Sequence, residues 1–461
     1  MKHYQHHWFH RRRRRRNLVI DGWSAQLTVG MLFGLSIGYS SPLLAEPGDH
    51  IGTGTVEIAP SVTVSTHHRN NVYLQEGELG GGQATTPGTA LVVNPNIGVE
   101  WDDPNVLFRS GLAYTATQYL QSEVSNLNRY NDVDVSGHLD LVRRGLIGLS
   151  FQDRFKINGY ESEAQKADDP YIQTIGNRGS GRFNIRPGPS LEISLGGDFS
   201  STAYDTPNSG DYVRAGQNDR VAYGPGLEMK WHFLPKTAVV FEWESEQFDW
   251  SNNFVGSSGN LGQDVGDFLG VPDGSLMRTR GGLRGRVTQK LVLRMLAGYG
   301  TADYDELTVS SETTSDTEPE SDISQGFGVD LGFPTGLLAE IDLEYTPRES
   351  QSVSIKYRRD FEDVFFTNFV VFNRFQVNYD GQFAGRYVLS ASSTLRLENY
   401  QGEVTRQDIR LLNAVGLQYS ATKYLVVNLG TRWRRRVSVA GEYPDIEYDD
   451  LDVHAGMTLT Y

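Results

Sequence analysis

The chain has 461 residues, no cysteine and a formal net charge of −15 at pH 7. The absence of cysteine excludes disulfides, thiolate metal sites and cysteine nucleophiles. The mean hydropathy is −0.42. Beyond residue 45 no apolar run approaches the ~18–20 residues that a membrane-spanning helix needs, which argues against a helical membrane protein.

The N-terminal residues 1–45 have the pattern of a secretory signal peptide. The segment is basic at Lys2 and over 11–16, mostly apolar over 27–37, and ends at Ala45, where cleavage is expected. A basic nucleic-acid-binding arm is the alternative, and the apolar block disfavours it. The segment holds seven Lys or Arg and one Asp, so its removal lowers the net charge from −15 by 6 to −21. Such acidity argues against a nucleic-acid partner, although it also serves as a plain solubility device.

Residues 46–461 are predicted to form one domain, in which apolar and polar residues alternate at every second position. This period of two residues is typical of β-strands with one apolar face and one polar, hydrated face. No fixed-period motif of a propeller or solenoid is present. The pattern predicts about 18 strands (16–18), at 54–70, 88–102, 105–119, 132–143, 146–158, 178–186, 191–204, 219–233, 237–250, 275–287, 291–303, 336–346, 349–361, 368–379, 385–399, 408–419, 424–439 and 450–461.

The connections between these strands alternate between short turns and long loops. Short connections contain residues that supply the backbone angles of tight turns, for example Arg144-Gly145 and Asp380-Gly381-Gln382. Long connections are polar, for example 159–177 and 252–274. This alternation predicts an all-β transmembrane protein, an outer-membrane antiparallel β-barrel with both termini in the periplasm. A soluble all-β array is the alternative.

The charged face of each strand is predicted to line the lumen, because Arg or Lys at mid-depth in lipid costs about 2–4 kcal/mol. Asp153 falls on the apolar face, and nothing in the sequence accounts for it. Aromatic residues near strand ends are expected to form interfacial girdles. They are Tyr114, Trp231, Trp250, Tyr345, Tyr379, Tyr387, Tyr419, Trp433 and Tyr461.

A barrel of this size can hold an aqueous channel, so the charges predicted to line it are candidate functional residues. The basic ones are Arg109, Arg154, Arg182, Arg186, Arg278, Arg280, Arg284, Arg286, Arg294, Arg358, Arg374, Arg396, Arg410, Arg432, Arg434 and Arg436. The acidic ones are Glu192, Glu228, Glu242, Glu244, Glu246, Glu340, Asp342 and Glu344. Arginines dominate 275–303 and 349–439, so we expect a basic wall that favours anions. Ion pairs that brace the barrel are the alternative for any single residue.

Other polar features suggest no chemistry. The segment 303–322 is acidic without Lys or Arg, and is expected to be an exposed loop rather than a gate or a Ca²⁺ site. His138, His232 and His454 fall on separated strands, and the pair His67-His68 is interpreted as solvated. No nucleophile elbow, zinc signature or nucleotide fingerprint is present. We therefore expect no enzyme, no catalytic residue, no metal and no cofactor.

The last eleven residues, Leu451 to Tyr461, alternate throughout and end on an aromatic residue. This ending is similar to the C-terminal strand by which outer-membrane barrels are recognised for assembly. We therefore expect the barrel assembly machinery to be a partner through Tyr461, and expect the barrel to lie among lipid and lipopolysaccharide of the cell outer membrane.

Short motifs add a family resemblance. They are H-R-N-N-V-Y at 68–73, A-T-Q-Y-L-Q-S at 116–122 and A-G-Y-G-T-A-D-Y-D at 297–305, together with the final strands. With these motifs the chain resembles the β-barrel porin type 2 family of Gram-negative bacteria over nearly all of residues 46–461. The resemblance implies a porin that exports a secreted polysaccharide, often encoded beside exopolysaccharide or capsule synthesis genes.

The sequence thus predicts an Arg-lined conduit for export of an anionic exopolysaccharide, with periplasmic export partners. A general diffusion porin for small solutes is the second hypothesis. A plugged structural or adhesive barrel is the third.

Overall fold

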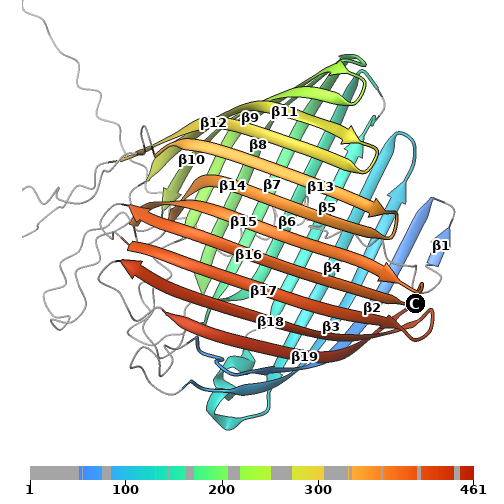
Figure 1. Ribbon diagram of the computed structural model, residues 1–461, viewed down its shortest axis with the longest axis vertical. Helices are drawn as coiled ribbons and strands as arrows, with labels where there is room; N and C mark the ends of the chain where they lie inside the picture. The colour runs from blue at the N-terminus through green and yellow to red at the C-terminus, as the bar shows by residue number, and fades with distance from the viewer. Residues whose placement is uncertain are drawn as a thin grey trace, which may run out of the picture.

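The computed structural model describes residues 51–53, 55–74, 85–129, 131–143, 145–161, 171–205, 219–250, 273–305, 331, 335–364, 367–401, 406–440 and 447–461. The sheet has 19 strands, of which β1 (Ile51–Thr53) is a short strand that pairs antiparallel with the first residues of β2. The remaining 18, β2 to β19, form one closed antiparallel ring of strongly tilted strands (Figure 1). The predicted barrel is therefore confirmed. The predicted signal peptide and most of the acidic segment 303–322 lie outside the described residues.

The strands follow one another around the ring in sequence order. They are β2 (Val56–Arg69), β3 (Gly88–Asp102), β4 (Val106–Tyr119), β5 (Asp132–Leu141), β6 (Ile147–Glu161), β7 (Tyr171–Gly188), β8 (Leu191–Asp205), β9 (Arg220–Leu234), β10 (Thr237–Trp250), β11 (Gly274–Thr288), β12 (Leu291–Tyr304), β13 (Leu337–Arg348), β14 (Gln351–Val364), β15 (Thr367–Phe383), β16 (Tyr387–Gln401), β17 (Arg406–Ser420), β18 (Leu425–Ala440) and β19 (Tyr448–Thr460). A 3₁₀ helix, η2 (Ser122–Arg129), connects β4 to β5. Short turns lie at the end of the barrel that holds the C terminus (the turn end), and longer connections lie at the other (the loop end).

The ring closes where the first strand meets the last. β19 pairs antiparallel with β2, from Asp452 opposite Arg69 to Thr460 opposite Ser61. The hydrogen-bonded ladder therefore continues around the whole circumference and leaves no open sheet edge. Backbone groups in the barrel wall are satisfied without water, as a hydrocarbon environment requires.

Alternation along the strands gives the barrel an apolar exterior. Large apolar side chains point outward on strands all around the ring, and Leu429, Val453 and Met457 are 51%, 49% and 54% exposed. The residues between them, such as Gly430 and His454, face the lumen. An exposed apolar surface of this extent is unfavourable in water and favourable in lipid. Among the described residues, no helix is long and apolar enough to cross a membrane.

Two local predictions were wrong. The strand predicted at 178–186 is the full-length β7, because backbone pairing with β6 runs from Ile147 opposite Ile185 to Glu161 opposite Tyr171 despite several glycines. The turn predicted at Asp380-Gly381-Gln382 lies inside β15. The chain turns instead at Ala384 and Gly385, whose φ angles are 48° and 68°, so Gly385 provides the left-handed conformation that a tight hairpin turn needs.

Asp153 does lie on the outer face, and its neighbours explain how. It stands in the ladder between Gly137 of β5 and Gly179 of β7. Because these residues have no side chains, they leave room for the carboxylate, and Asp153 is only 8% exposed. A Cβ at position 179 would lie 3.2 Å from its Oδ1 atom. The glycines therefore shelter this carboxylate from the hydrocarbon.

At the loop end, β14 and β15 extend beyond β13. The pairing of β13 with β14 stops at Ala339 opposite Arg359, whereas β14 and β15 stay paired to Val364 opposite Thr367. We call residues 360–364 and 367–371 the β14–β15 tip. No described strand flanks β14 there, so this edge of the tip is not held by the wall, whereas β15 stays paired with β16 as far as Phe369 opposite Gln401.

The tip turns inward and packs inside the barrel. The ring of Phe361 lies so close to Gly300 of β12 that a Cβ there would be 2.3 Å from it. The tip joins a buried apolar cluster that consists of Ala222, Phe248, Trp250, Leu276, Ala302, Tyr304, Leu331, Leu338, Phe361, Phe369 and Val371. Trp250 was predicted to lie in an interfacial girdle, and this is wrong, because it is 5% exposed within this cluster. The tip therefore narrows the lumen at the loop end.

Candidate permeation site

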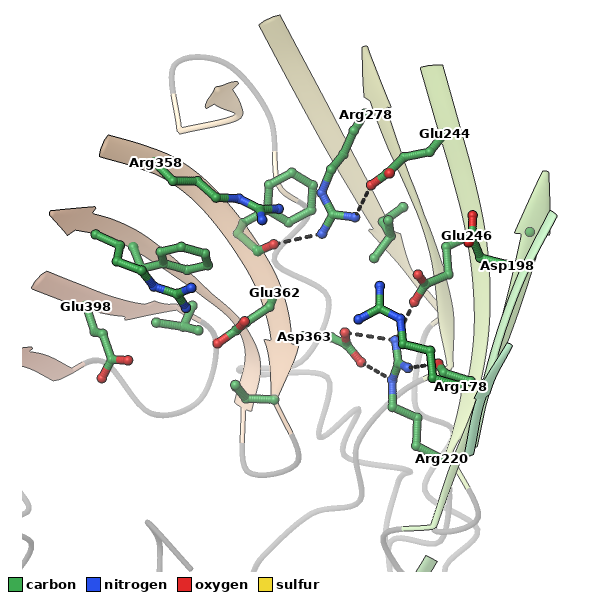
Figure 2. Close-up of a pocket in the computed structure, with 18 of the residues that line it drawn as sticks. Arg178, Asp198, Arg220, Glu244, Glu246, Arg278, Arg358, Glu362, Asp363 and Glu398 are labelled. Atoms are coloured by element: carbon green, nitrogen blue, oxygen red, sulfur yellow. Dashed lines mark hydrogen bonds and ion pairs between the residues drawn. The ribbon is translucent and has the colours of Figure 1, made fainter. Parts of the chain in front are cut away.

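Beside the tip, a charged cavity of about 760 Å³ lies inside the barrel. Figure 2 shows side chains from β14 to β16 on one side of it and from β7 to β11 on the other. Its charged lining residues are Arg178, Arg182, Asp198, Arg220, Glu244, Glu246, Arg278, Arg358, Glu362, Asp363, Arg374, Arg396, Glu398 and Arg410. A solute that crosses the barrel beside the tip passes these groups.

Ion pairs hold the tip across the lumen. Asp363 of the tip accepts hydrogen bonds from Arg220 of β9, with an Oδ2–Nε distance of 2.5 Å. Four strands separate β9 from β14 in the ring, so this pair bridges the lumen rather than neighbouring strands (Figure 2). Arg220 also donates to Glu246 of β10, with an Nη2–Oε1 distance of 2.6 Å.

Asp360, at the base of the tip, is 1% exposed and accepts hydrogen bonds from three arginines. Arg280 and Arg358 each approach its Oδ2 atom to 2.5 Å, and Arg278 Nε lies 3.1 Å from its Oδ1 atom. Arg278 also donates to the backbone oxygen of Phe361 at 2.8 Å. A buried carboxylate with three cations is a strong anchor, because losing it would leave all three guanidinium groups uncompensated.

Five arginines form a continuous row across five adjacent strands. They are Arg358, Arg374, Arg396, Arg410 and Arg436. Each of them is paired in the ladder with the next arginine on the neighbouring strand. Like charges placed directly opposite repel, so the row depends on acids. Glu398 lies 2.7 Å from both Arg396 and Arg410, and Asp408 lies 2.5 Å from Arg436.

Arg374 stands in the middle of this arginine row without such a partner. Its guanidinium lies 5.2 Å from the centre of the Phe372 ring, and it makes no ion pair with any described residue. Arg178, on the opposite side of the cavity, likewise has no ion pair within the described part of the chain.

Every acid that lines the cavity has an ion-pair partner, whereas two of the arginines have none among the described residues. The cavity therefore has an excess of positive charge. Asp198 pairs with Arg182, Glu244 with Arg278, and Glu362 and Glu398 with Arg396. Glu246 and Asp363 both pair with Arg220. The two guanidinium groups without a described counter-ion, at Arg178 and Arg374, are therefore the groups in the cavity that are available to an anion.

The predicted lining residues fall into three groups. Of these, Arg182, Arg278, Arg358, Arg374, Arg396, Arg410, Glu244 and Glu246 line the cavity. Other residues are held in pairs elsewhere: Arg154 with Asp134, Arg294 with Glu242 and Glu340, Arg280 with Asp360, Arg434 with Asp450, Arg436 with Asp408, Asp342 with Lys356, and Glu228 with Lys230. Arg284, Arg286 and Arg432 are exposed and have no ion pair with a described residue.

The expected basic wall is interrupted, because acids of β14, β16, β17 and β19 lie among its arginines and pair with them. Sequence reasoning missed Asp198, Asp360, Glu362, Asp363, Glu398, Asp408 and Asp450, and the basic residues Arg178 and Arg220. Most share the strand parity of residues that were predicted, as Arg178 does with Arg182. Asp363 has the opposite parity to Asp360, and no sequence signal places it in the lumen, because the tip turns out of the wall.

The closed antiparallel ring, apolar outside and charged inside, defines a transmembrane β-barrel of the outer-membrane class. No family model matches the chain, and no curated protein matches it.

Several solved barrels are similar in shape. The siderophore receptor PirA of Pseudomonas aeruginosa is 11% identical with a TM-score of 0.39, covering 90% of this chain and 81% of its own. The FrpB iron transporter of Neisseria meningitidis (F3-3 variant) is 9% identical with a TM-score of 0.41, covering 87% and 81%. The outer membrane protein opdK of Pseudomonas aeruginosa is 11% identical with a TM-score of 0.40, covering 88% and 99%. Such a likeness concerns the barrel shape and carries nothing about function.

Proposed function

We propose that this protein is an outer-membrane channel that passes anions, without catalysis, through the charged cavity beside the β14–β15 tip. The observation that carries the proposal is the unequal pairing there, in which all the acids have ion pairs while Arg178 and Arg374 have none with a described residue. A free guanidinium offers parallel donors to a carboxylate, phosphate or sulfate. Arginines that line a pore favour anions over cations.

The cargo that we assign to this channel is an acidic exported polysaccharide. Arg178 of β7 and Arg374 of β15 lie on opposite sides of the cavity, so a chain of repeated carboxylates can contact one free guanidinium group and then the other. Two separated contacts of this kind guide a polyanion without a single tight binding site. The family resemblance of the sequence supports the same cargo.

The direct test is planar-bilayer conductance of the native chain, with the reversal potential measured under a KCl gradient. We expect an anion-selective pore. Replacing both free arginines, in the double variant Arg178→Gln/Arg374→Gln, should lower the chloride-to-potassium permeability ratio by at least about twofold. The physical reason is that the remaining cavity arginines are already neutralised by acids.

The matched control is Arg435→Gln, which removes an arginine from the outward-facing positions of β18. It should leave the permeability ratio unchanged. An unchanged ratio in the double variant, or an equal loss in the control, would contradict anion passage through this cavity.

A diffusion porin for small anionic solutes is the second candidate, and the inward tip favours it because a narrowed lumen suits small molecules. Polygalacturonate and a neutral dextran of equal length distinguish the two. For an exporter, polygalacturonate should interrupt the current and dextran should not, and the double variant should weaken the block. If phosphate and citrate permeate while polygalacturonate has no effect, the polysaccharide cargo is wrong and the anion channel stands.

A further inference from the structure

Three side chains of the kind that bind metals meet at the closing seam of the barrel. His67 of β2 stands directly opposite His454 of β19 in the ladder. Asp452 lies two residues before His454 on the same lumen-facing side of β19. The potential ligand atoms of all three lie within 4.8 Å of one another. In the sequence, His67 and Asp452 are 385 positions apart, so only the closure of the ring brings them together.

The contacts of His67 hold its ring in one orientation. Its Nδ1 atom lies 3.2 and 3.3 Å from the two carboxylate oxygens of Asp452. Its Nε2 atom lies 3.0 Å from the hydroxyl oxygen of Ser65. A histidine that ligates a metal commonly has its second ring nitrogen held by such a partner, which selects the tautomer.

His454 differs from His67, because one of its two ring nitrogens makes no hydrogen bond to a described residue. The Nδ1 atom is enclosed and has no hydrogen-bond partner within the described residues, which is costly for a polar atom. The ring stacks on that of His67, with centroids 4.9 Å apart and an interplanar angle of 17°. It also lies over Gly430 of β18, where a Cβ would be 2.5 Å from Cε1 and Nε2. The absence of a side chain at Gly430 therefore makes room for this imidazole.

The neighbouring arginines leave the Asp452 carboxylate available to a metal ion. Arg69 and Arg434 both direct their guanidinium groups to Asp450, at 3.2 and 2.7 Å. Arg432, which faces Asp452 across the ladder, is exposed and forms no ion pair with it. Among the described residues, the Asp452 carboxylate is hydrogen-bonded to the imidazole of His67 rather than to an arginine.

We propose that His67, Asp452 and His454 bind one divalent first-row transition-metal ion, such as Zn²⁺, which ties the first strand of the barrel to the last. Two imidazoles and one carboxylate suit Zn²⁺, Cu²⁺ or Ni²⁺ and not Ca²⁺ or Mg²⁺, which prefer oxygen ligands. Binding replaces the proton between His67 Nδ1 and Asp452. Donor atoms around tetrahedral zinc are about 3.4 Å apart, so the three side chains draw together by roughly 1 Å. Water completes the coordination.

The first measurement is Zn²⁺ binding to the full barrel in detergent, by isothermal titration after treatment with a chelator. His454→Ala and His67→Ala should each weaken the seam site by at least about tenfold. The matched control is His68→Ala, since His68 is adjacent in sequence but points to the opposite face of β2, where its Nδ1 contacts Thr89. It should bind like the wild type. Histidines elsewhere are common to all variants and cancel in the comparison.

A second readout keeps the test decisive if an alanine variant folds poorly. Asp452→Asn keeps the shape of the carboxylate but removes its charge, and should weaken Zn²⁺ binding without disturbing the fold. Because an ion bound only by the closed barrel stabilises it, Zn²⁺ should raise the temperature at which the compact band is lost in detergent gels. Mg²⁺ should have no effect. Equal Zn²⁺ binding by the wild type, His454→Ala and Asp452→Asn would overturn the proposal, as would an equal response to Mg²⁺.

Discussion

On the outer face of β6, the carboxylate of Asp153 lies between two glycines of the adjoining strands. A charged or polar group is costly in the hydrocarbon layer, and a side chain that stood out from the sheet would meet lipid directly. The outer face can hold this carboxylate because Gly137 and Gly179 have no side chains and leave the space that it occupies. A residue that contradicts the alternation of its own strand can thus be explained by residues of the neighbouring strands.

This explanation predicts the effect of filling that space. Gly179→Val should displace the Asp153 carboxylate toward lipid and lower the free energy of unfolding by about 1–2 kcal/mol. The measurement is the urea dependence of folding in lipid vesicles, followed by tryptophan fluorescence. In Asp153→Leu the same valine should cost less, because no carboxylate remains to be displaced.

Gly181→Val, on the same strand and the same outer face, is the control. A Cβ at position 181 would have ring atoms of Phe151 as its nearest neighbours, at 3.5 Å, which is an ordinary contact. If both valine variants lower the free energy of unfolding equally, the loss comes from replacing any glycine of this strand and not from displacing the Asp153 carboxylate.

At the level of whole elements, the β14–β15 tip is the part of the barrel that departs from a simple wall. Its inward position depends on two kinds of contact. The apolar cluster buries Phe361 and Phe369, which are each 2% exposed, and the Arg220–Asp363 pair ties the tip to β9. Apolar burial supplies most of the stabilisation, and the ion pair adds a direct link between the tip and β9.

We expect Asp363→Ala to loosen the tip without unfolding the barrel. Arg220 keeps its partner Glu246, but the tie across the lumen is gone. The single-channel conductance should therefore rise by about half or more, since the tip narrows the lumen. Single-channel recordings in planar bilayers measure this directly.

The comparison variant for the tip is Asp342→Ala, which also removes one acid. Asp342 pairs with Lys356 of the adjoining strand at 3.3 Å, so its loss does not release the tip. Similar conductance changes in the two variants would show that lumen charge, and not the position of the tip, controls the width of the pore.

For the molecule as a whole, the selectivity of the proposed channel should depend on salt. The Debye length falls from about 10 Å at 0.1 M to about 3 Å at 1 M ionic strength. Free arginines that act on passing ions across a hydrated lumen are therefore screened. We expect the chloride-to-potassium permeability ratio to fall toward one between these concentrations in the wild type.

The double variant at Arg178 and Arg374 supplies the comparison for this salt series. It should show a weaker salt dependence, because the two free guanidinium groups of the cavity are absent. A wild-type ratio that stays constant up to 1 M salt would mean that contact at a narrow passage, rather than long-range charge, selects the ion.

The sequence by itself determined the strands, their order and the closed class of fold. These depend on local signals, namely a period of two and turn-forming residues, and each can be read within a few residues. Its two errors about the strands were also local. Glycines in β7 hid a strand that its two neighbours stabilise, and Asp380-Gly381 looked like a turn that the chain makes four residues later.

Only the tertiary structure decided which charges neutralise one another, where the tip lies and which histidines meet. The pairs Arg220–Asp363 and His67–Asp452 join residues that are 143 and 385 positions apart, and no periodicity specifies such distances. Parity assigns a side chain to the lumen but not to a partner within it. Partners depend on the stagger of the strands, on the closure of β2 with β19, and on the bending of β14 away from a wall that β13 no longer supports.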